Sequence, residues 1–459
     1  MNQLEPERDA MHARYLAPLL MLLIGAAPAT QPAHLSFLDN GIIRVGVNLD
    51  AGGAITHLSA AGEDAENLVN NWDWGRQIQM SHYAGPVPFK PAGKQPAAIW
   101  AGLGWNPVQA GDHFKNKSRV VEHRNDGKTI ILTCIPMQWP LDNVPSECLF
   151  QTRITLEKNT VRVSCRLTNQ RSDHTQYPAR GQELPAIYTI GKLYRLFSYS
   201  GDKPFTGEAI ERIEKRNPVP GTTMPNWSHW QATENWAALV NDKDWGVGVW
   251  NPSTFEFSGG FYGKEGAGGT HDDPTGYIAP TGLQILDCNV VYDYSYALIV
   301  GSLADIRAYA MEHGKPSGLP AWRFQSDRQG CYYVNASDTG WPIRGELDVQ
   351  LSSDDPQLIG PMNFWQASDA PLVRIEAAFK TQGSPAVLYF RAFGDAGFTA
   401  DKFVSFPVQT DGVYHVYEVD LSKSPAYRGA MTQLRLDPAA TAKSGDGVKV
   451  RSIELRSAK

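Results

Sequence analysis

The sequence predicts an all-β protein, with a large antiparallel sandwich domain followed by a smaller module of the jelly-roll or β-sandwich type. The 42 glycines and 31 prolines among 459 residues suit short strands joined by turns. Apolar and polar residues alternate in most of the regular segments, which is the pattern of strands with one buried face. A chain of this length exceeds one ordinary core, so two domains are expected.

Two hairpins are the clearest local predictions. Residues 150–156 and 161–167 both alternate and are joined by a turn at Lys158 and Asn159. Residues 236–240 and 245–250 flank a polar four-residue connection. Shorter strand signals occupy residues 42–48 and 292–300. Together these segments predict an antiparallel sheet structure for the first part of the chain.

Only two segments have a helical pattern. Residues 206–216 begin with threonine and carry two apolar residues, which predicts a helix there. Residues 302–313 begin with Ser302 and Asp305 at capping-box spacing and are followed by Gly314 and Pro316, which favour a helix end. Residues 314–320, rich in Gly and Pro, are therefore the predicted linker.

Five alternating runs follow the linker, and they predict the smaller module by their strand-and-turn spacing. The predicted domain bounds are residues 31–314 for the first domain and 321–459 for the second. The alternating runs are residues 372–379, 387–393, 413–421, 432–436 and 448–455.

The first 30 residues have the order of a secretory signal. Arg14 precedes an apolar run over residues 15–24, and small residues follow over 25–29. The apolar run is too short for an ordinary membrane-spanning helix. We therefore expect residues 1–30 to be a signal peptide. The mature protein is expected to be secreted or periplasmic and to have no membrane span after the signal is removed.

Charge and cysteine usage narrow the function further. The net charge is −6 and no long basic run occurs, so nucleic acid is not an expected partner. The five cysteines form no CxxC pair, and the histidines lack metal-ligand spacing, so no metal and no cofactor are expected. Export permits a disulfide, although the odd count leaves at least one thiol unpaired. Cys165, in an alternating strand, is expected to be a small buried hydrophobe.

Polar and aromatic residues gather in six segments without strand alternation: residues 70–83, 103–112, 136–142, 177–188, 226–236 and 268–277. Indole rings stack on the apolar faces of sugars, and amide, guanidinium and carboxylate groups bind sugar hydroxyls. This composition predicts a carbohydrate as the partner. The predicted substrate-binding residues are Arg76, Gln79, His82, Tyr83, Trp105, Asn106, Gln109, Trp139, Arg180, Gln182 and Trp236.

Two reaction types fit these residues. Glycoside hydrolysis needs two carboxyl groups, and Glu183, Glu234 and Asp73 are the predicted catalytic residues. Elimination from a uronate needs a base and an acid, for which His82 and Tyr83 are candidates, or His229 or His271 with Tyr277. A third interpretation is a carbohydrate-binding protein without catalysis.

Three short motifs resemble the galactose-mutarotase-like supersandwich superfamily of carbohydrate-active proteins. They are Gly52-Gly53 followed by Ala-Ile-Thr, Gly75-Arg76 followed by Gln79, and the strand that ends in Leu-Thr-Asn169. The resemblance covers about residues 35–309 and implies a site on the concave face of a large curved sheet, with Arg76, Arg180 and Glu183 contributing.

The sequence departs from the epimerases of that superfamily. They carry a histidine directly after the Thr-Asn pair, where Gln170 stands here, and their Gly-Gly-His element is absent. The second module resembles, by strand spacing, the jelly-roll modules appended to secreted glycosidases. The leading interpretation is therefore a glycoside hydrolase acting on a polysaccharide or oligosaccharide.

Overall fold

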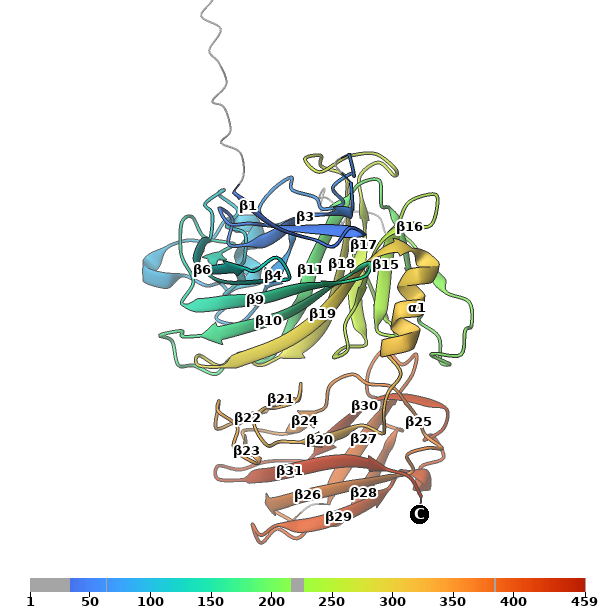
Figure 1. The fold of residues 1–459 in the computed structure, drawn as a ribbon. Coiled ribbons are helices and arrows are strands. Elements are labelled where there is room, and N and C mark those ends of the chain that lie inside the picture. The colour runs from blue at the N-terminus through green and yellow to red at the C-terminus, as the bar shows by residue number, and fades with distance from the viewer. Residues whose placement is uncertain (1–33, 63, 216–226, 384, 459) are drawn as a thin grey trace, which may run out of the picture. The chain divides into compact units, whose positions relative to one another are not determined.

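The computed structural model describes residues 34–62, 64–215, 227–383 and 385–458 (Figure 1). The predicted signal segment lies outside the described residues. Nearly all of the regular structure is β-strand, arranged in antiparallel sheets, which confirms the all-β prediction. These described residues belong to one compact unit.

The first part of the chain forms two large sheets around one core, to which Ile187 and Ile278 contribute from the first sheet and Phe150 and Leu298 from the second. Sheet 1 runs in the order β1 (Leu35–Asp39), β2 (Ile43–Asn48), β3 (Ala54–Ala60), β4 (Ile78–Ser81), β11 (Arg180–Ile190), β18 (Thr275–Gln284), β17 (Glu256–Tyr262) and β14 (Ser228–Gln231), with β5 (Pro107–Val108) on β4 and β8 (Met137–Gln138) on β5. Sheet 2 runs in the order β13 (Glu211–Ile213), β12 (Arg195–Ser198), β15 (Trp236–Val240), β16 (Trp245–Trp250), β19 (Val291–Ser302), β10 (Thr160–Asn169), β9 (Cys148–Glu157), β7 (Thr129–Ile135) and β6 (Arg119–Asn125).

Both predicted hairpins are confirmed. Strands β9 and β10 pair antiparallel from Glu157 opposite Thr160 to Cys148 opposite Asn169, and Lys158 turns between them with a φ of 51°. Strands β15 and β16 pair in the same way. The alternation seen in the sequence therefore reflects one face on the shared core and one face outside it.

The two helix predictions have opposite outcomes. The second is confirmed as α1 (Leu303–His313), which begins with a complete capping box between Ser302 and Asp305. The first is wrong, because the described part of that segment, residues 206–215, is irregular and contains β13. Ile213 lies opposite Leu196 in sheet 2, so pairing at the sheet edge overrides a weak local helical pattern.

The C-terminal part forms two further sheets around a separate core. The five predicted alternating runs are all strands, namely β26 (Leu372–Lys380), β27 (Ala386–Ala392), β29 (His415–Asp420), β30 (Ala430–Asp437) and β31 (Gly447–Arg456). The predicted domain bounds and the jelly-roll topology stay predictions. Sheet 3 runs β22 (Ala336–Asp338), β23 (Leu347–Leu351), β31 (Gly447–Arg456), β26 (Leu372–Lys380) and β29 (His415–Asp420), with β20 (Ala321–Arg323) on β31. Sheet 4 runs β21 (Tyr332–Val334), β24 (Gln357–Ile359), β30 (Ala430–Asp437), β27 (Ala386–Ala392) and β28 (Phe403–Phe406), with β25 (Trp365–Gln366) on β30. Short 3-10 turns occupy Pro91–Gly93, Ala98–Leu103 and Leu421–Lys423.

A buried polar cluster connects the two sandwiches. The Arg328 guanidinium lies 2.7 Å from the carboxylate of Asp287 in the first sandwich and 2.5 Å from that of Asp338 in the second. Asp287 also accepts a hydrogen bond from the backbone N–H of Trp341 at 3.0 Å. Because both charges of each pair are buried, removing any one of these side chains would leave a buried charge without its counterion.

All five cysteines are free thiols, and Cys165 is buried as expected. No helix in the described ranges has the length and apolar content needed to cross a membrane.

Helix α1 packs on the face of sheet 2 that lies away from the shared core. Gly248 permits the close contact, because a Cβ there would lie 2.2 Å from a methyl carbon of Ile306. Beneath the helix, the fully buried carboxylate of Glu234 receives both arms of the Arg307 guanidinium at 2.9 and 3.0 Å. It also accepts hydrogen bonds from the Trp236 indole and the backbone N–H of Phe205, each at 3.0 Å.

Replacing Glu234 by glutamine is expected to lower the free energy of unfolding by about 3–5 kcal/mol, because it leaves the Arg307 charge without its buried counterion. Denaturant unfolding of the purified protein measures this. The matched control is Glu157→Gln, which removes an ion pair whose side chains are 59% and 41% exposed and should cost less than about 1 kcal/mol. Equal losses in the two variants would show that Glu234 has no special structural role.

Candidate active site

Strand alternation places a group of polar and aromatic side chains on the outer face of sheet 1, the face away from the shared core. On β11 and β18, Ile187 and Ile278 point into the core, so that their neighbours Tyr188 and Tyr277 point outward. Glu183 is the direct cross-strand partner of Thr281 on β18, and Thr281 is in turn the partner of Glu256 on β17. This row of polar residues therefore crosses the outer face.

Glu183 is the centre of the group. Its Oε2 accepts a hydrogen bond from the Tyr83 hydroxyl at 2.7 Å, and its Oε1 accepts one from the Tyr277 hydroxyl. Ser81 donates to the Tyr83 oxygen at 3.1 Å. Burial, and then the charge of Glu183, raise the pKa values of Tyr83 and Tyr277 well above 10. Both phenols thus keep their protons at neutral pH and act as donors to Glu183.

Asp73 and Arg76 approach the same group from the loop before β4. Burial raises the pKa of Tyr188, and the charges of Glu183 and Asp73 raise it further, whereas Arg76 lowers it. The loop follows the end of β11, because the Asn70 N–H donates to the backbone oxygen of Tyr188 at 3.1 Å. Asp73 accepts the backbone N–H of Gly75 at 2.8 Å, and its second oxygen lies 3.5 Å from the Arg76 guanidinium.

Hydrogen bonds hold this loop beside the sheet. Arg76 donates to the backbone oxygen of Asp273 at 2.5 Å and to its side chain at 3.1 Å. The Asn70 amide donates to the backbone oxygens of Asp272 and Pro274 at 3.0 and 3.2 Å. Residues 200 positions apart in the sequence are thereby fixed together at one end of β11 and β18.

An aromatic group adjoins the carboxylates. The rings of Tyr188 and Tyr277 have centroids 4.7 Å apart, and Trp227 lies 4.9 Å from Tyr277 on the other side. The small residues Ala186 and Ala279 pack beneath these rings. Aromatic rings beside hydrogen-bonding groups are the combination that a sugar ring requires.

Two predicted site residues, Tyr83 and Glu183, therefore contact each other on the outer face, and two more, Asp73 and Arg76, lie on the loop that is fixed to one end of β11 and β18. Four others form a buried network that supports the chain around β4 and exposes no more than 2% of any side chain. The side-chain oxygens of Gln79, Gln109 and Gln182 accept hydrogen bonds from the backbone N–H groups of Ala110, Met80 and Tyr83, respectively. The side-chain amide of Asn106 donates a hydrogen bond to the backbone oxygen of His82.

His82 faces the shared core rather than the outer face. It is fully buried and packs edge-on against Phe150, Tyr292 and Tyr294. Its Nδ1 lies 3.2 Å from the Gln182 side-chain oxygen. Burial lowers its pKa to about 4. The structure thus separates His82 from Tyr83, although they are adjacent in the sequence.

The predicted tryptophans and Glu234 also lie elsewhere. Trp105, Trp139 and Trp236 are buried, at 1%, 8% and 0% exposed, and are core residues. Glu234 is enclosed beneath α1 with Arg307, so the structure does not bring it to Glu183. Arg180 is partly buried and donates to the backbone oxygen of Gly102 at 3.2 Å.

Three residues of the outer face were not among the predicted site residues. Tyr188 and Trp227 belong to the segments singled out in the sequence, but nothing local distinguishes them from core aromatics. Glu256 lies at the start of β17, and burial raises the pKa of its carboxyl group. Its alternation with the core residue Phe257 was the available signal.

The described residues contain no group of three or more His, Cys, Asp or Glu side chains arranged to hold a metal ion.

No protein-family model matches the sequence, and no curated protein matches it. Among solved structures, a galactose mutarotase related enzyme from Lactobacillus acidophilus is 14% identical, with 58% of this chain and 97% of that chain covered and a TM-score of 0.32. A galactose mutarotase-like protein from Lactobacillus casei is 12% identical, with 58% and 99% covered and a TM-score of 0.33. An alpha-galactosidase from Geobacillus stearothermophilus is 12% identical, with 58% of this chain and 39% of that chain covered and a TM-score of 0.34.

Protonation of His82 is expected to destabilise the fold in acid. The pKa of His82 falls from 6.5 to about 4 on folding, so its contribution to stability is complete above pH 6.5 and is lost as the pH falls toward 4. At roughly 1.4 kcal/mol per pH unit, the loss amounts to about 3 kcal/mol. Chemical denaturation at pH 7 and 4.5 should therefore show a smaller loss for His82→Phe than for the wild type. The exposed His174, replaced in the same way, should leave the wild-type loss unchanged.

Proposed function

We propose that the protein is a glycoside hydrolase whose reaction takes place on the outer face of sheet 1, with Glu183 and Asp73 as the two carboxyl groups. The observation that carries this proposal is the Glu183 carboxylate, which accepts hydrogen bonds from Tyr83 and Tyr277. The loop that carries Asp73 is fixed beside it, because the Asn70 N–H donates to the backbone oxygen of Tyr188 at 3.1 Å and Arg76 donates to Asp273. Glycoside hydrolysis requires two carboxyl groups on either side of the scissile bond.

Glu183 is suited to the role of base or nucleophile. Each of its oxygens accepts a phenolic hydrogen bond, so the group is oriented as an acceptor by Tyr83 and Tyr277. In the reaction, Glu183 takes a proton from the attacking water or attacks the anomeric carbon itself. Both alternatives consume one water molecule and break the bond between the anomeric carbon and the glycosidic oxygen.

Asp73 is then the partner that delivers a proton to the departing glycosidic oxygen. It is 41% exposed and stands on a loop that Arg76 anchors to Asp273, so it can reach a substrate held against the sheet. Tyr277 is 4% exposed and lies between the rings of Tyr188 and Trp227, so these two flanking rings offer the surface on which a sugar would stack.

Elimination is the less suitable reaction. His82 points into the core, and Tyr83 and Tyr277 retain their protons, so none of these groups is an accessible base at neutral pH. A base that abstracts a proton needs a pKa near the working pH. His82, Tyr83 and Tyr277 are therefore unsuited to be the base of an elimination, whereas the exposed His229 and His271 remain the candidates for that alternative.

The variants Glu183→Gln and Asp73→Asn should each lower kcat/KM by about 10²–10⁴-fold, because each removes an acid–base group without changing side-chain size. The assay is release of reducing ends from a panel of polysaccharides, with circular dichroism to confirm folding. Glu157→Gln, which removes an exposed carboxylate on sheet 2, is the matched control and should retain full activity.

Three results would count against the proposal. Full activity of Glu183→Gln would remove its central residue, and products with the ultraviolet absorbance of an unsaturated uronate would indicate elimination. Binding of a glycan without any product would indicate a non-catalytic protein.

Export is proposed from the signal-like order of residues 1–30. Fusing residues 1–33 to a reporter enzyme that is active only outside the cytoplasm should produce activity. Replacing Leu19, Leu20 and Leu22 in the apolar run by aspartate should abolish it, and equal activity in both fusions would contradict export.

A further inference from the structure

A cleft adjoins the Glu183 site along the row of polar residues on sheet 1. It has a volume of about 630 Å³. Thr281, the direct partner of Glu183, lines it together with Gly181, Glu256 and Gln231 from sheet 1 and Arg391 from sheet 4. The cleft thus reaches β11 at Gly181, two residues before the proposed catalytic carboxylate.

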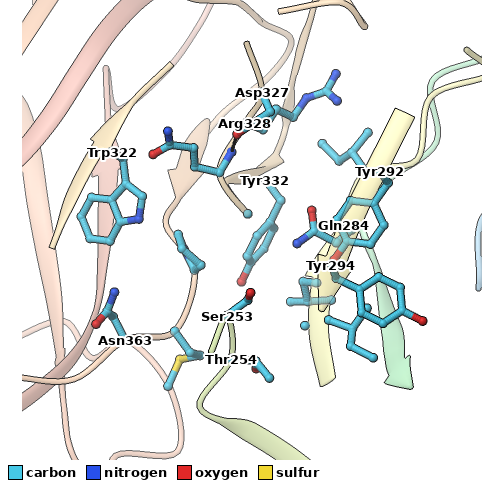
Figure 2. Close-up of a pocket in the computed structure, with 18 of the residues that line it drawn as sticks. Ser253, Thr254, Gln284, Tyr292, Tyr294, Trp322, Asp327, Arg328, Tyr332 and Asn363 are labelled. Atoms are coloured by element: carbon cyan, nitrogen blue, oxygen red, sulfur yellow. Dashed lines mark hydrogen bonds between the residues drawn. The ribbon is translucent and has the colours of Figure 1, made fainter. Parts of the chain in front are cut away.

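A second cavity of about 780 Å³ is lined by both sandwiches (Figure 2). It shares four lining residues with the first cleft: Glu256, Gly282, Leu283 and Arg391. Because the two spaces have these residues in common, they adjoin at Glu256 and Arg391. Pockets of this size at the junction of two folded units are frequent ligand sites.

The lining of the second cavity is aromatic and amide-rich. Figure 2 shows Tyr332 between Trp322 and Asn363 on one side and Gln284 and Tyr292 on the other. Sugars pair apolar ring faces with aromatic side chains, and their hydroxyls exchange hydrogen bonds with amides. This lining therefore matches the chemistry of a glycan.

The charges in the cavity favour a neutral ligand over an anionic one. Arg328 is engaged by the carboxylates of Asp287 and Asp338. Arg391 donates to the backbone oxygen of Asp395 at 2.7 and 3.0 Å. Asp293 is paired with Arg166 at 2.8 Å, so the carboxylates of Glu256 and Asp327 supply the remaining negative charge of the lining. An anionic chain would meet those carboxylates.

We propose that the two adjoining cavities bind successive residues of a neutral glycan chain that reaches Glu183, so that the substrate is an oligosaccharide or polysaccharide rather than a single sugar. The second sandwich thereby contributes Tyr332, Asn363 and Arg391 to substrate binding. This inference rests on the proposed function only in placing one end of the glycan at Glu183. Binding of the glycan in the cavities is testable without catalysis.

Affinity electrophoresis tests the binding directly. Wild-type protein is run in native gels that contain xylan, mannan, β-glucan or galactan as neutral polysaccharides, and pectate or alginate as anionic ones. We expect retardation by at least one neutral polysaccharide, with at least a fivefold weaker effect in Tyr332→Ala and Asn363→Ala. Phe403→Ala, which removes a 39% exposed ring outside the cavity, is the matched control and should be retarded like the wild type.

Glu183→Gln separates the inference from the proposed function. Undiminished retardation of this variant, together with loss of cleavage, supports both. Retardation of the wild type without cleavage of any polysaccharide would contradict the hydrolase and leave the cavity inference in place. Retardation only by anionic polysaccharides, by none, or equally in Tyr332→Ala would overturn the cavity inference. Circular dichroism of each variant excludes loss of folding as the cause.

Discussion

The two hydrogen bonds that Tyr83 and Tyr277 donate to Glu183 hold the whole candidate site together. Tyr83 follows β4, Glu183 lies on β11 and Tyr277 lies on β18, so that these bonds join side chains from three neighbouring parts of sheet 1. They form only because each of these residues points away from the core that the two large sheets share. The phenols keep their protons, and breaking either bond would leave a hydroxyl and a carboxylate oxygen without a hydrogen-bonding partner, which costs free energy.

Much of the fold follows from the sequence, because strand alternation and turn residues are local signals. The hairpin of β9 and β10 and the capped helix α1 depend on neighbours a few residues away, and both were predicted correctly. The segment around Ile213 was not, because its structure is decided by pairing with Leu196 at a sheet edge. Two apolar residues in a local pattern carry no information about that long-range strand pairing.

The site was predictable only in part, for a related reason. Asp73, Arg76, Tyr83 and Glu183 occur in polar, aromatic segments and were singled out on composition. Glu234 has the same kind of neighbours, but a buried arginine on α1 makes it a structural residue. Tyr188 and Tyr277 come together through the irregular register between β11 and β18, where the five residues from Glu183 to Ile187 lie opposite the four from Ile278 to Thr281. Register of this kind is not encoded in the composition of either strand.

The second sandwich lines both cavities, one of which includes Thr281, the cross-strand partner of Glu183, and it supplies aromatic and amide groups to the larger one. The most direct test of the account is a crystal structure of Glu183→Gln with a neutral oligosaccharide bound. The account predicts one sugar residue against Tyr188 and Trp227, within hydrogen-bond distance of residues 73 and 183, and further residues passing Glu256 toward Tyr332. A glycan bound elsewhere, with the outer face of sheet 1 unoccupied, would contradict it.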